Sequence, residues 1–399
     1  MNMSGPLKGI VVLDLTHVLA GPFAAMVLAD LGATVIKIEQ PGVGDRSRAS
    51  GPFIEEESTY FMSINRGKKG MSLDLKKERG KNIFLKFVEK ADVIVENMSP
   101  GAMKRLGLEY DILNGYNPGI IYASISGFGQ TGPYSNKGAL DVIIQGMGGV
   151  MSITGEPGGP PIRPGVSQGD ITPALFSVIG ILSALQERSI SGKGQFVDIS
   201  MLDCQVSILE NAFIRYFATG VVPKPLGTRH PVTAPFQAFP TKDGYITVAL
   251  ADGRNEKWPL FCSAIDRIDL IHDKRLDDGW LRSQNWHLAE PIINEALSKK
   301  TTNDWLLEFE ELGIPCGPVY SIDQVVEDPQ VKHRQMIRKV PHPRIGHVDA
   351  IDTPVKLSRT PGGIQSHSPA LGEHTEYLLK SVLSLTDQEI EELRADESI

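Results

Sequence analysis

The stretch Gly165-Val-Ser-Gln-Gly-Asp-Ile-Thr-Pro173 lies between a loop dense in glycine and proline, 154–161, and an apolar segment, 171–190. The apolar residues of this segment recur with the period of a helix. Because proline is tolerated only in the first turn of a helix, Pro173 predicts that the helix begins close to Asp170. The glycines that precede Asp170 allow the backbone to approach a ligand closely. Asp170 is then either a helix cap, which stabilises by about 1 kcal/mol, or a functional carboxylate.

Length and composition restrict the class of protein. A chain of 399 residues predicts two domains, and 41% hydrophobic residues allow large cores. The net charge is −8 and basic residues are scattered, which argues against a nucleic-acid or membrane surface. Cys204, Cys262 and Cys316 are far apart, so we predict neither a disulfide framework nor a metal site. We find no signal peptide or apolar run of transmembrane length, and expect a soluble cytoplasmic protein.

Short apolar runs alternate with helical segments through the first half of the chain. The runs are 9–16, 33–39, 92–96, 119–126 and 194–200, and the helical segments are 22–31, 77–90, 103–113 and 203–218. This alternation predicts a parallel α/β sheet of the Rossmann type. Glycine fingerprints of dinucleotide sites and P-loops do not occur, nor does a GxSxG elbow. Ligands of such sheets bind at the carboxyl ends of the strands, here the loops 16–21, 39–44, 97–101 and 127–132.

A second domain follows from a change in pattern. Residues 221–227 are typical of a linker, and 236–250 predict a hairpin around Lys242-Asp243-Gly244. Three helical segments, 256–265, 286–297 and 302–312, follow. We therefore predict a small α+β domain at 226–328 and a large domain made of 1–225 plus 329–399. The C-terminal part contains a strand-like run, 353–357, and a helix from Glu373.

An ordered set of motifs covers almost the whole chain. It comprises Asp14-Leu-Thr-His-Val-Leu-Ala-Gly-Pro22, Val35-Ile-Lys-Ile-Glu39, Val95-Glu-Asn97, Pro100-Gly101, Ser126-Gly-Phe-Gly-Gln-Thr-Gly-Pro133, Gly155-Glu-Pro157, Gly169-Asp170, Gly192-Lys-Gly-Gln195, Ile314-Pro-Cys-Gly-Pro318 and Leu371-Gly-Glu-His374. From about residue 5 to 395 the sequence resembles the class III CoA-transferase family, which includes formyl-CoA:oxalate and carnitine CoA-transferases.

The resemblance implies a fold, a reaction and a site. The fold would be a large Rossmann-like domain and a smaller one, in an interlocked homodimer. The substrates would be an acyl-CoA and a carboxylic acid, with no tightly bound cofactor, and Asp170 would be the catalytic residue. By match to formyl-CoA transferases, the residues that bind CoA would be His17, Val18, Ala20, Gln40, Leu73, Lys76, Asn97, Met98, Arg105 and Lys137.

The sequence departs from formyl-CoA transferases at three places. Gln40 replaces an arginine, Leu19 replaces a glutamine, and the charged segment 250–258 replaces a glycine-rich lid. These departures argue against formyl-CoA and oxalate as substrates. Arg254 could pair with the second carboxylate of a dicarboxylic acid, or lie in a solvated turn.

The chemistry of a carboxylate suits thioester exchange. It is already ionised at pH 7, so it attacks a thioester carbonyl without a general base. The anhydride and thioester that follow hydrolyse easily, so the site must exclude water. Two alternatives remain: a 2-methylacyl-CoA racemase, which needs a histidine where Leu140 precedes Asp141, and a CoA-binding protein without turnover.

Individually, the other candidate residues have ordinary structural explanations. His17 could be a hydrogen-bonded structural histidine and Asn97 a turn residue, while Lys137 and Arg105 could be solvated surface charges. Glu39 and Glu96, at the ends of strands, could hold loops. Their occurrence in one ordered set favours the functional explanation.

Overall fold

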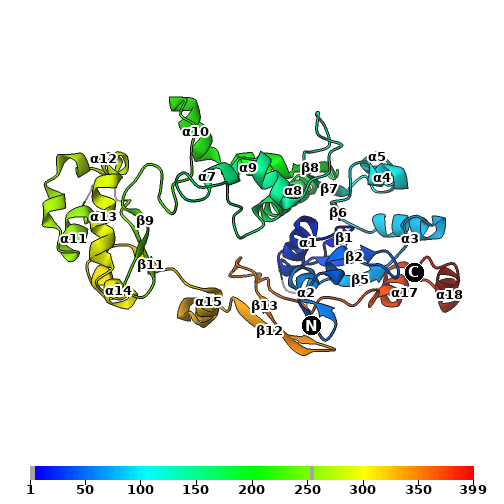
Figure 1. The fold of residues 1–399 in the computed structure, drawn as a ribbon. Coiled ribbons are helices and arrows are strands. Elements are labelled where there is room, and N and C mark those ends of the chain that lie inside the picture. The colour runs from blue at the N-terminus through cyan, green and yellow to red at the C-terminus, as the bar shows by residue number, and fades with distance from the viewer. Residues whose placement is uncertain (1–4, 252–255) are drawn as a thin grey trace. The chain divides into compact units, whose positions relative to one another are not determined.

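The computed structural model describes residues 5–251 and 256–399 (Figure 1). Arg254, the predicted carboxylate partner, lies outside these residues. The chain divides into two compact units: one formed by residues up to 150 with 163–217 and 330–399, and one formed by 151–162 with 218–329. The second unit differs from the predicted small domain because 151–162 belongs to it. There the Gly227 amide donates to the Gly155 carbonyl at 2.8 Å, which joins this loop to the linker.

A six-stranded parallel sheet forms the first unit, with the order β5-β2-β1-β6-β7-β8. The strands are β1 (Val11–Asp14), β2 (Thr34–Glu39), β5 (Lys69–Ser72), β6 (Val93–Glu96), β7 (Ile121–Ser126) and β8 (Phe196–Ser200). All neighbouring strands pair in parallel, and β1 lies between β2 and β6. The prediction of a Rossmann-like α/β sheet is therefore confirmed.

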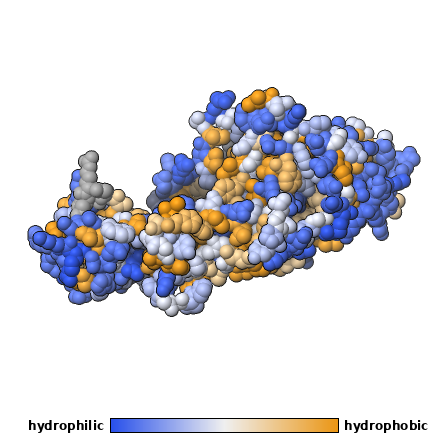
Figure 2. All heavy atoms as spheres, turned by 90° about the horizontal axis from the view of Figure 1, so that it is seen from above, coloured by the Kyte–Doolittle hydropathy of each residue, from blue (hydrophilic) through white to orange (hydrophobic). Residues whose placement is uncertain are grey.

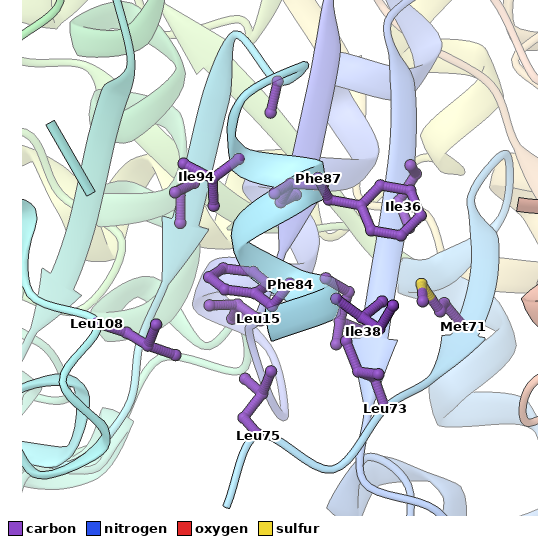
Figure 3. Close-up of a cluster of buried hydrophobic side chains, with 14 of the residues drawn as sticks. Leu15, Ile36, Ile38, Met71, Leu73, Leu75, Phe84, Phe87, Ile94 and Leu108 are labelled. Atoms are coloured by element: carbon purple, nitrogen blue, oxygen red, sulfur yellow. The ribbon is translucent and has the colours of Figure 1, made fainter. Parts of the chain in front are cut away.

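Helices cover both faces of this sheet, as near-continuous apolar strands require. On one face α3 (Glu78–Val88) inserts Phe84 and Phe87 among apolar residues of the strands, together with α17 (Thr375–Leu383) and α18 (Asp387–Ala395). Figure 3 shows Phe84 and Phe87 beside Leu15 and Ile36 in this core. On the other face α1 (Ala20–Asp30) and α8 (Gln168–Ser191) pack against the sheet and each other.

Helix α8 begins three residues earlier than predicted, so Pro173 lies in its second turn. One side of the helix, including Ala174, Val178 and Ile181, is buried against the sheet. The opposite side exposes Leu175, Ile179 and Leu182. By length and composition α8 is the one described helix able to cross a bilayer, a property that core helices of soluble proteins share.

Two predicted helices are interrupted. Segment 103–113 forms α4 (Ala102–Leu106) and α5 (Tyr110–Tyr116), because Gly107 adopts a left-handed φ of 69° that ends α4. Segment 203–218 forms α9 (Met201–Ile208) and α10 (Glu210–Thr219).

The strand-like run 353–357 is irregular, and the nearby hairpin is β12 (Ile337–His342) with β13 (Gly346–Ile351). The remaining elements of the first unit are the 3-10 helix η1 (Arg46–Ala49), β3 (Phe53–Ile54), β4 (Glu57–Ser58), α2 (Thr59–Asn65), α6 (Asp141–Met147) and α16 (Pro329–His333), while most of α7 (Val150–Ile153) belongs to the second unit.

The second unit contains an antiparallel sheet of the order β11-β10-β9. The predicted hairpin is confirmed as β9 (Phe236–Pro240) and β10 (Tyr245–Ala249), and β11 (Cys316–Pro318) pairs with β10. Its helices are α11 (Lys257–Ala264), α12 (Gly279–Gln284), α13 (Trp286–Leu297), α14 (Thr302–Glu311) and α15 (Ile322–Glu327), with short 3-10 helices at Ile268–Ile271 and Lys274–Leu276. Trp258, Phe261, Trp286 and Phe309 form its core.

Candidate active site

Asp170 faces a cavity of about 400 Å³ at the carboxyl end of the sheet. The cavity is walled by the loop that follows β1, the loop that follows β6, and the end of β7 with the segment after it. Its lining includes His17, Val18, Asn97, Ser126 and Lys137. Asp170 itself lies in the first turn of α8. Residues of three predicted strand-end loops, 16–21, 97–101 and 127–132, therefore meet around the predicted nucleophile, whereas residues of the loop 39–44 line a different cavity.

The Asp170 carboxylate does not cap its helix. Ser167 occupies the cap position, and among residues 5–251 and 256–399 none hydrogen-bonds the Asp170 side chain. The explanation of Asp170 as an N-cap is therefore wrong. Burial raises its pKa to about 6, the charge of Asp141 adds to this, and the charge of Arg163 opposes it. The result is a half-buried carboxylate that is mostly ionised at pH 7 and free to react.

Asp141 holds the turn that carries Asp170. Its Oδ1 accepts a hydrogen bond from the Gly169 amide at 2.9 Å, so it caps the first turn of α8. Its Oδ2 accepts from Arg163 Nη2 at 2.6 Å, and Arg163 also donates to Ser167 Oγ at 2.8 Å. A Cβ on Gly169 would lie 2.8 Å from the Asp141 carbonyl oxygen, so only glycine fits this approach.

A second cavity, of about 510 Å³, shares a wall with the first. Both are lined by His17, Arg46, Met98 and Ala102. Every residue predicted from the resemblance lines one or both cavities: Val18, Ala20, Asn97, Lys137 and Asp170 the first, Gln40, Leu73, Lys76 and Arg105 the second, and His17 and Met98 both. The structure thus brings the predicted set together along one edge of the sheet.

Four basic side chains along these cavities have no acidic partner within residues 5–251 and 256–399. Lys76, Arg105, Lys137 and Arg46 are exposed, and among the described residues no carboxylate pairs with any of them. Lys137 Nζ lies 3.8 Å from the ring centroid of Tyr134, and Arg105 Nη1 donates weakly to the Pro100 carbonyl at 3.3 Å. Four cations without counter-charges favour an anionic ligand.

The wall shared by the two cavities is a strained loop. Val18 has a φ of 68°, which costs a β-branched residue about 1–2 kcal/mol. Asn97 holds the preceding residue from both sides, accepting from the His17 amide at 2.8 Å and donating to the His17 carbonyl at 2.9 Å. The Val18 amide donates to Asp45 Oδ1 at 3.1 Å. Burial and the positive charge of Lys37 lower the pKa of His17, which therefore stays neutral at pH 7.

Buried charged side chains hold this loop in place. Lys37 and Asp45 form an ion pair at 2.9 Å with both side chains inaccessible to solvent. Lys37 Nζ also donates to the Thr16 carbonyl at 2.9 Å. Burial alone would raise the pKa of Asp45, but Lys37 and the hydrogen bonds from Ser47 and Val18 lower it well below its usual range. Glu39 and Glu96 hold loops rather than line the nucleophile's cavity: Glu39 accepts from the Asp45 amide at 2.8 Å, and Glu96 from the Met98 amide at 2.8 Å.

Sequence reasoning missed several residues of the site. Asp141 appeared only as the neighbour of a missing histidine, and Arg163 and Arg46 were not singled out. Ser126 was quoted only within a motif, yet its Oγ is buried at the cavity wall without a hydrogen-bond partner among the described residues. Asp141 and Arg163 could not be found by spacing, because 22 residues separate them and only the fold joins them.

The raised pKa of Asp170 predicts a pH dependence for the reaction that the family resemblance implies. If Asp170 is the nucleophile of that reaction, only its ionised carboxylate attacks, so kcat/KM for acyl-CoA should be flat above pH 7 and fall about tenfold between pH 7 and 5. Initial rates measured from pH 4.5 to 8 would give the apparent pKa. Arg163→Gln should move that pKa upward, because the charge of Arg163 favours the ionised form. An apparent pKa near 4 in the unmodified protein would contradict this assignment.

Known proteins resemble this chain along most of its length. The family model described as CoA-transferase family III matches residues 7–375. Succinyl-CoA:glutarate CoA-transferase of Mus musculus is 40% identical over 97% of this chain and 89% of its own length. Acetyl-CoA:oxalate CoA-transferase of Acetobacter aceti is 41% identical over 89% of this chain and 90% of its own. The crystal structure of a CAIB/BAIF family protein from Brucella suis has a TM-score of 0.84 and 36% identity, and covers 95% of this chain and 100% of that one.

Proposed function

The chain belongs to CoA-transferase family III, and we propose that it transfers CoA between dicarboxylic acids with Asp170 as the covalent nucleophile. One observation carries the role of Asp170. Its carboxylate is half-buried, faces the cavity and accepts no hydrogen bond from the described residues. A carboxylate kept without partners in a partly desolvated site is reactive, whereas a structural one would be paired.

The proposed reaction proceeds through two covalent intermediates. Asp170 attacks the thioester carbonyl, the C–S bond breaks, and an acyl-aspartyl anhydride and CoA thiolate result. The thiolate attacks the aspartyl carbonyl, which releases the first acid as a carboxylate and leaves an aspartyl-CoA thioester. The carboxylate of the second acid attacks this thioester and expels the thiolate, which then attacks the new acyl carbonyl and restores Asp170. No proton transfer is required, which fits a site whose histidine, His17, is neutral.

Two observations support dicarboxylic acids as substrates. The names of the relatives described above contain succinyl-CoA, glutarate and oxalate, which carry a second carboxylate, beside acetyl-CoA, which does not. The cavity wall also offers Arg46 and Lys137, which no carboxylate of the described residues neutralises. The sequence departures argued against oxalate, but we keep it among the proposed substrates because one of the relatives is named acetyl-CoA:oxalate CoA-transferase.

We propose that CoA lies along the two cavities, with its phosphates near Lys76 and Arg105 and its thioester near Asp170. Arg105→Ala is then expected to weaken CoA binding by about 1.5–3 kcal/mol, the contribution typical of a hydrogen bond to a charged group. Titration calorimetry with CoA measures this directly. Lys104→Ala is a matched control, because Lys104 lies on the same short helix and lines neither cavity. Equal CoA affinity in both variants and the unmodified protein would make Arg105 structural.

We also propose a homodimer that works in the cytoplasm. The exposed side of α8, with Leu175, Ile179 and Leu182, has the four- and three-residue spacing of a helix that packs against another surface. Ile214 and Phe217 of α10 are 64% and 70% exposed. Figure 2 shows orange, hydrophobic patches between hydrophilic regions of the surface. Several exposed apolar side chains of this kind favour association with a second subunit, which would bury them.

The two alternatives are not favoured. A racemase would need a second base beside the nucleophile, but Leu140 stands where it has a histidine, and Asp141 is occupied by Arg163 and Gly169. A CoA-binding protein without turnover would not need a free carboxylate in the cavity.

A substrate panel tests the function. The protein is incubated with succinyl-CoA, glutaryl-CoA or acetyl-CoA and, in separate reactions, with glutarate, succinate, oxalate, mesaconate and butyrate, and the CoA esters are identified by mass spectrometry. The expected result is a new dicarboxylyl-CoA formed at the expense of the donor, with little ester of butyrate. Hydrolysis alone, or equal use of butyrate, would contradict the proposed substrate class.

A further inference from the structure

The backbone of Val18 is held in a conformation that its own side chain disfavours. Its φ of 68° lies in the left-handed region, where a β-branched residue is a rare outlier. The side chain is 39% exposed, so its packing does not explain why this conformation persists. Such strain persists only where the surroundings over-determine it, and it is concentrated at functional sites.

The residues that hold the Val18 backbone in this conformation are buried and polar. Asp45 Oδ1 accepts from the Val18 amide at 3.1 Å, and Asp45 Oδ2 pairs with Lys37 Nζ at 2.9 Å. Asp45 is itself fixed, because its amide donates to Glu39 Oε1 at 2.8 Å and Ser47 donates to it from both amide and hydroxyl. Glu39 is in turn held by Arg48, whose guanidinium lies 3.6 Å from the centre of the Phe61 ring.

This arrangement fixes the position of a cavity wall. Val18 lies between His17, which lines both cavities, and Leu19, after which α1 begins. The chain folds tightly here: a Cβ on Gly21 would lie 2.4 Å from the Thr16 side chain. With Asn97 holding His17 and Asp45 holding Val18, a relaxation of φ at Val18 would displace the whole segment from His17 to Ala20.

We infer that Asp45 is a positioning residue, which uses its ion pair with Lys37 to hold Val18 left-handed and thereby keeps the wall between the two cavities in the shape that binds CoA. The inference rests on the proposed place of CoA in these cavities. Asp45 lines neither of them and would not touch the substrate.

A double-mutant cycle separates positioning from stability. Asp45→Ala is made alone and together with Val18→Gly, because glycine adopts a φ near 68° without strain. The probe is CoA, titrated by calorimetry, with KM for succinyl-CoA as a second readout. Asp45→Ala should raise the dissociation constant of CoA by about tenfold or more. In the Val18→Gly background the same substitution should change it by less than about threefold, because the backbone no longer needs to be held.

Asp30→Ala is the matched control. Asp30 is 2% exposed and ion-paired with Arg66 at 2.6 Å in the same unit, but it lines neither cavity. It should lower the melting temperature and leave CoA affinity unchanged. An Asp45→Ala protein that loses stability but binds CoA normally, or loses affinity equally in both backgrounds, would overturn the inference. So would a crystal structure of Asp45→Ala with residue 18 still left-handed.

Two further results would separate a failure of this inference from a failure of the proposed reaction and from a variant that does not fold. If the unmodified protein binds CoA but exchanges none, the proposed reaction fails while the cycle still decides the role of Asp45. If Asp45→Ala does not fold, the unfolding midpoint of Val18→Gly decides. It should rise, because a strained residue is replaced by one that is not. A fall would show that Val18 is not strained and would overturn the inference.

Discussion

Replacing Asp170 with asparagine is expected to reduce CoA transfer by about 10⁴-fold or more, as for the removal of other nucleophiles. The amide is nearly the same size, so the cavity keeps its shape, but it cannot form the anhydride. Stability should not fall. Since burial raises the pKa of Asp170 to about 6, above its value in an unfolded chain, the protonated form stabilises the fold at low pH and this contribution is lost as pH rises through 6. At pH 7 the neutral amide should therefore unfold no earlier than the charged carboxylate.

The measurement is the initial rate of CoA exchange together with the melting temperature of the same preparation. Asp203→Asn serves as control, because Asp203 also lies in the first turn of a helix, α9, but outside the nucleophile's cavity. It should retain full activity. Exchange by Asp170→Asn within tenfold of the unmodified protein would end the proposal of a covalent aspartyl intermediate.

Gly169→Ala should be the next most damaging change, with a loss of about a hundredfold in kcat. The new Cβ would lie 2.8 Å from the Asp141 carbonyl oxygen and 2.9 Å from its Oδ1. Because the first of these is backbone, the turn itself must move. Its movement would break the hydrogen bond from the Gly169 amide to Asp141 and displace Asp170 from the cavity edge. Exchange rates and the dissociation constant of CoA distinguish a misplaced nucleophile, which lowers kcat, from a lost binding site.

Gly180→Ala is the matched control for this change. Gly180 lies in the same helix, and its added Cβ would meet a methyl group of Val197 at 2.7 Å, a crowding of similar size but against a side chain. We expect it to alter the melting temperature and to leave exchange intact. If both glycine variants lose activity alike, the effect comes from damage to the helix and not from the position of Asp170.

The sheet could be predicted from the sequence because parallel strands that are buried on both faces are nearly continuous apolar runs. The runs containing Val35–Glu39 and Ile121–Ser126 are nearly continuous apolar segments between helical patterns, and they form β2 and β7. The first and last residues of the helices were harder to predict from the sequence. The break at Gly107 requires a left-handed residue, which apolar periodicity does not reveal. The start of α8 was missed because Asp141, distant in sequence, caps its first turn in place of a local residue.

The site was predictable as a set of residues but not as a mechanism. The quoted motifs contained Asp170, His17 and Asn97. The contacts of Asp141 with Arg163 and Gly169, and of Asp45 with Val18, instead join residues that are 22 or more positions apart. Lys37 illustrates the limit. It occurred only within a quoted motif, yet its side chain is fully buried and paired with Asp45. Only the fold shows which charges are compensated and which, like the Asp170 carboxylate, are left free.

Direct detection of a modified Asp170 tests the covalent mechanism most closely. The protein is mixed with succinyl-CoA, treated with hydroxylamine, digested and analysed by mass spectrometry. Hydroxylamine attacks an aspartyl anhydride or aspartyl-CoA thioester and leaves a stable hydroxamate. We predict a hydroxamate on the peptide that contains Asp170, formed only when acyl-CoA is present and absent from the Asp170→Asn protein. An unmodified Asp170 peptide in a preparation that exchanges CoA at full rate would contradict the mechanism.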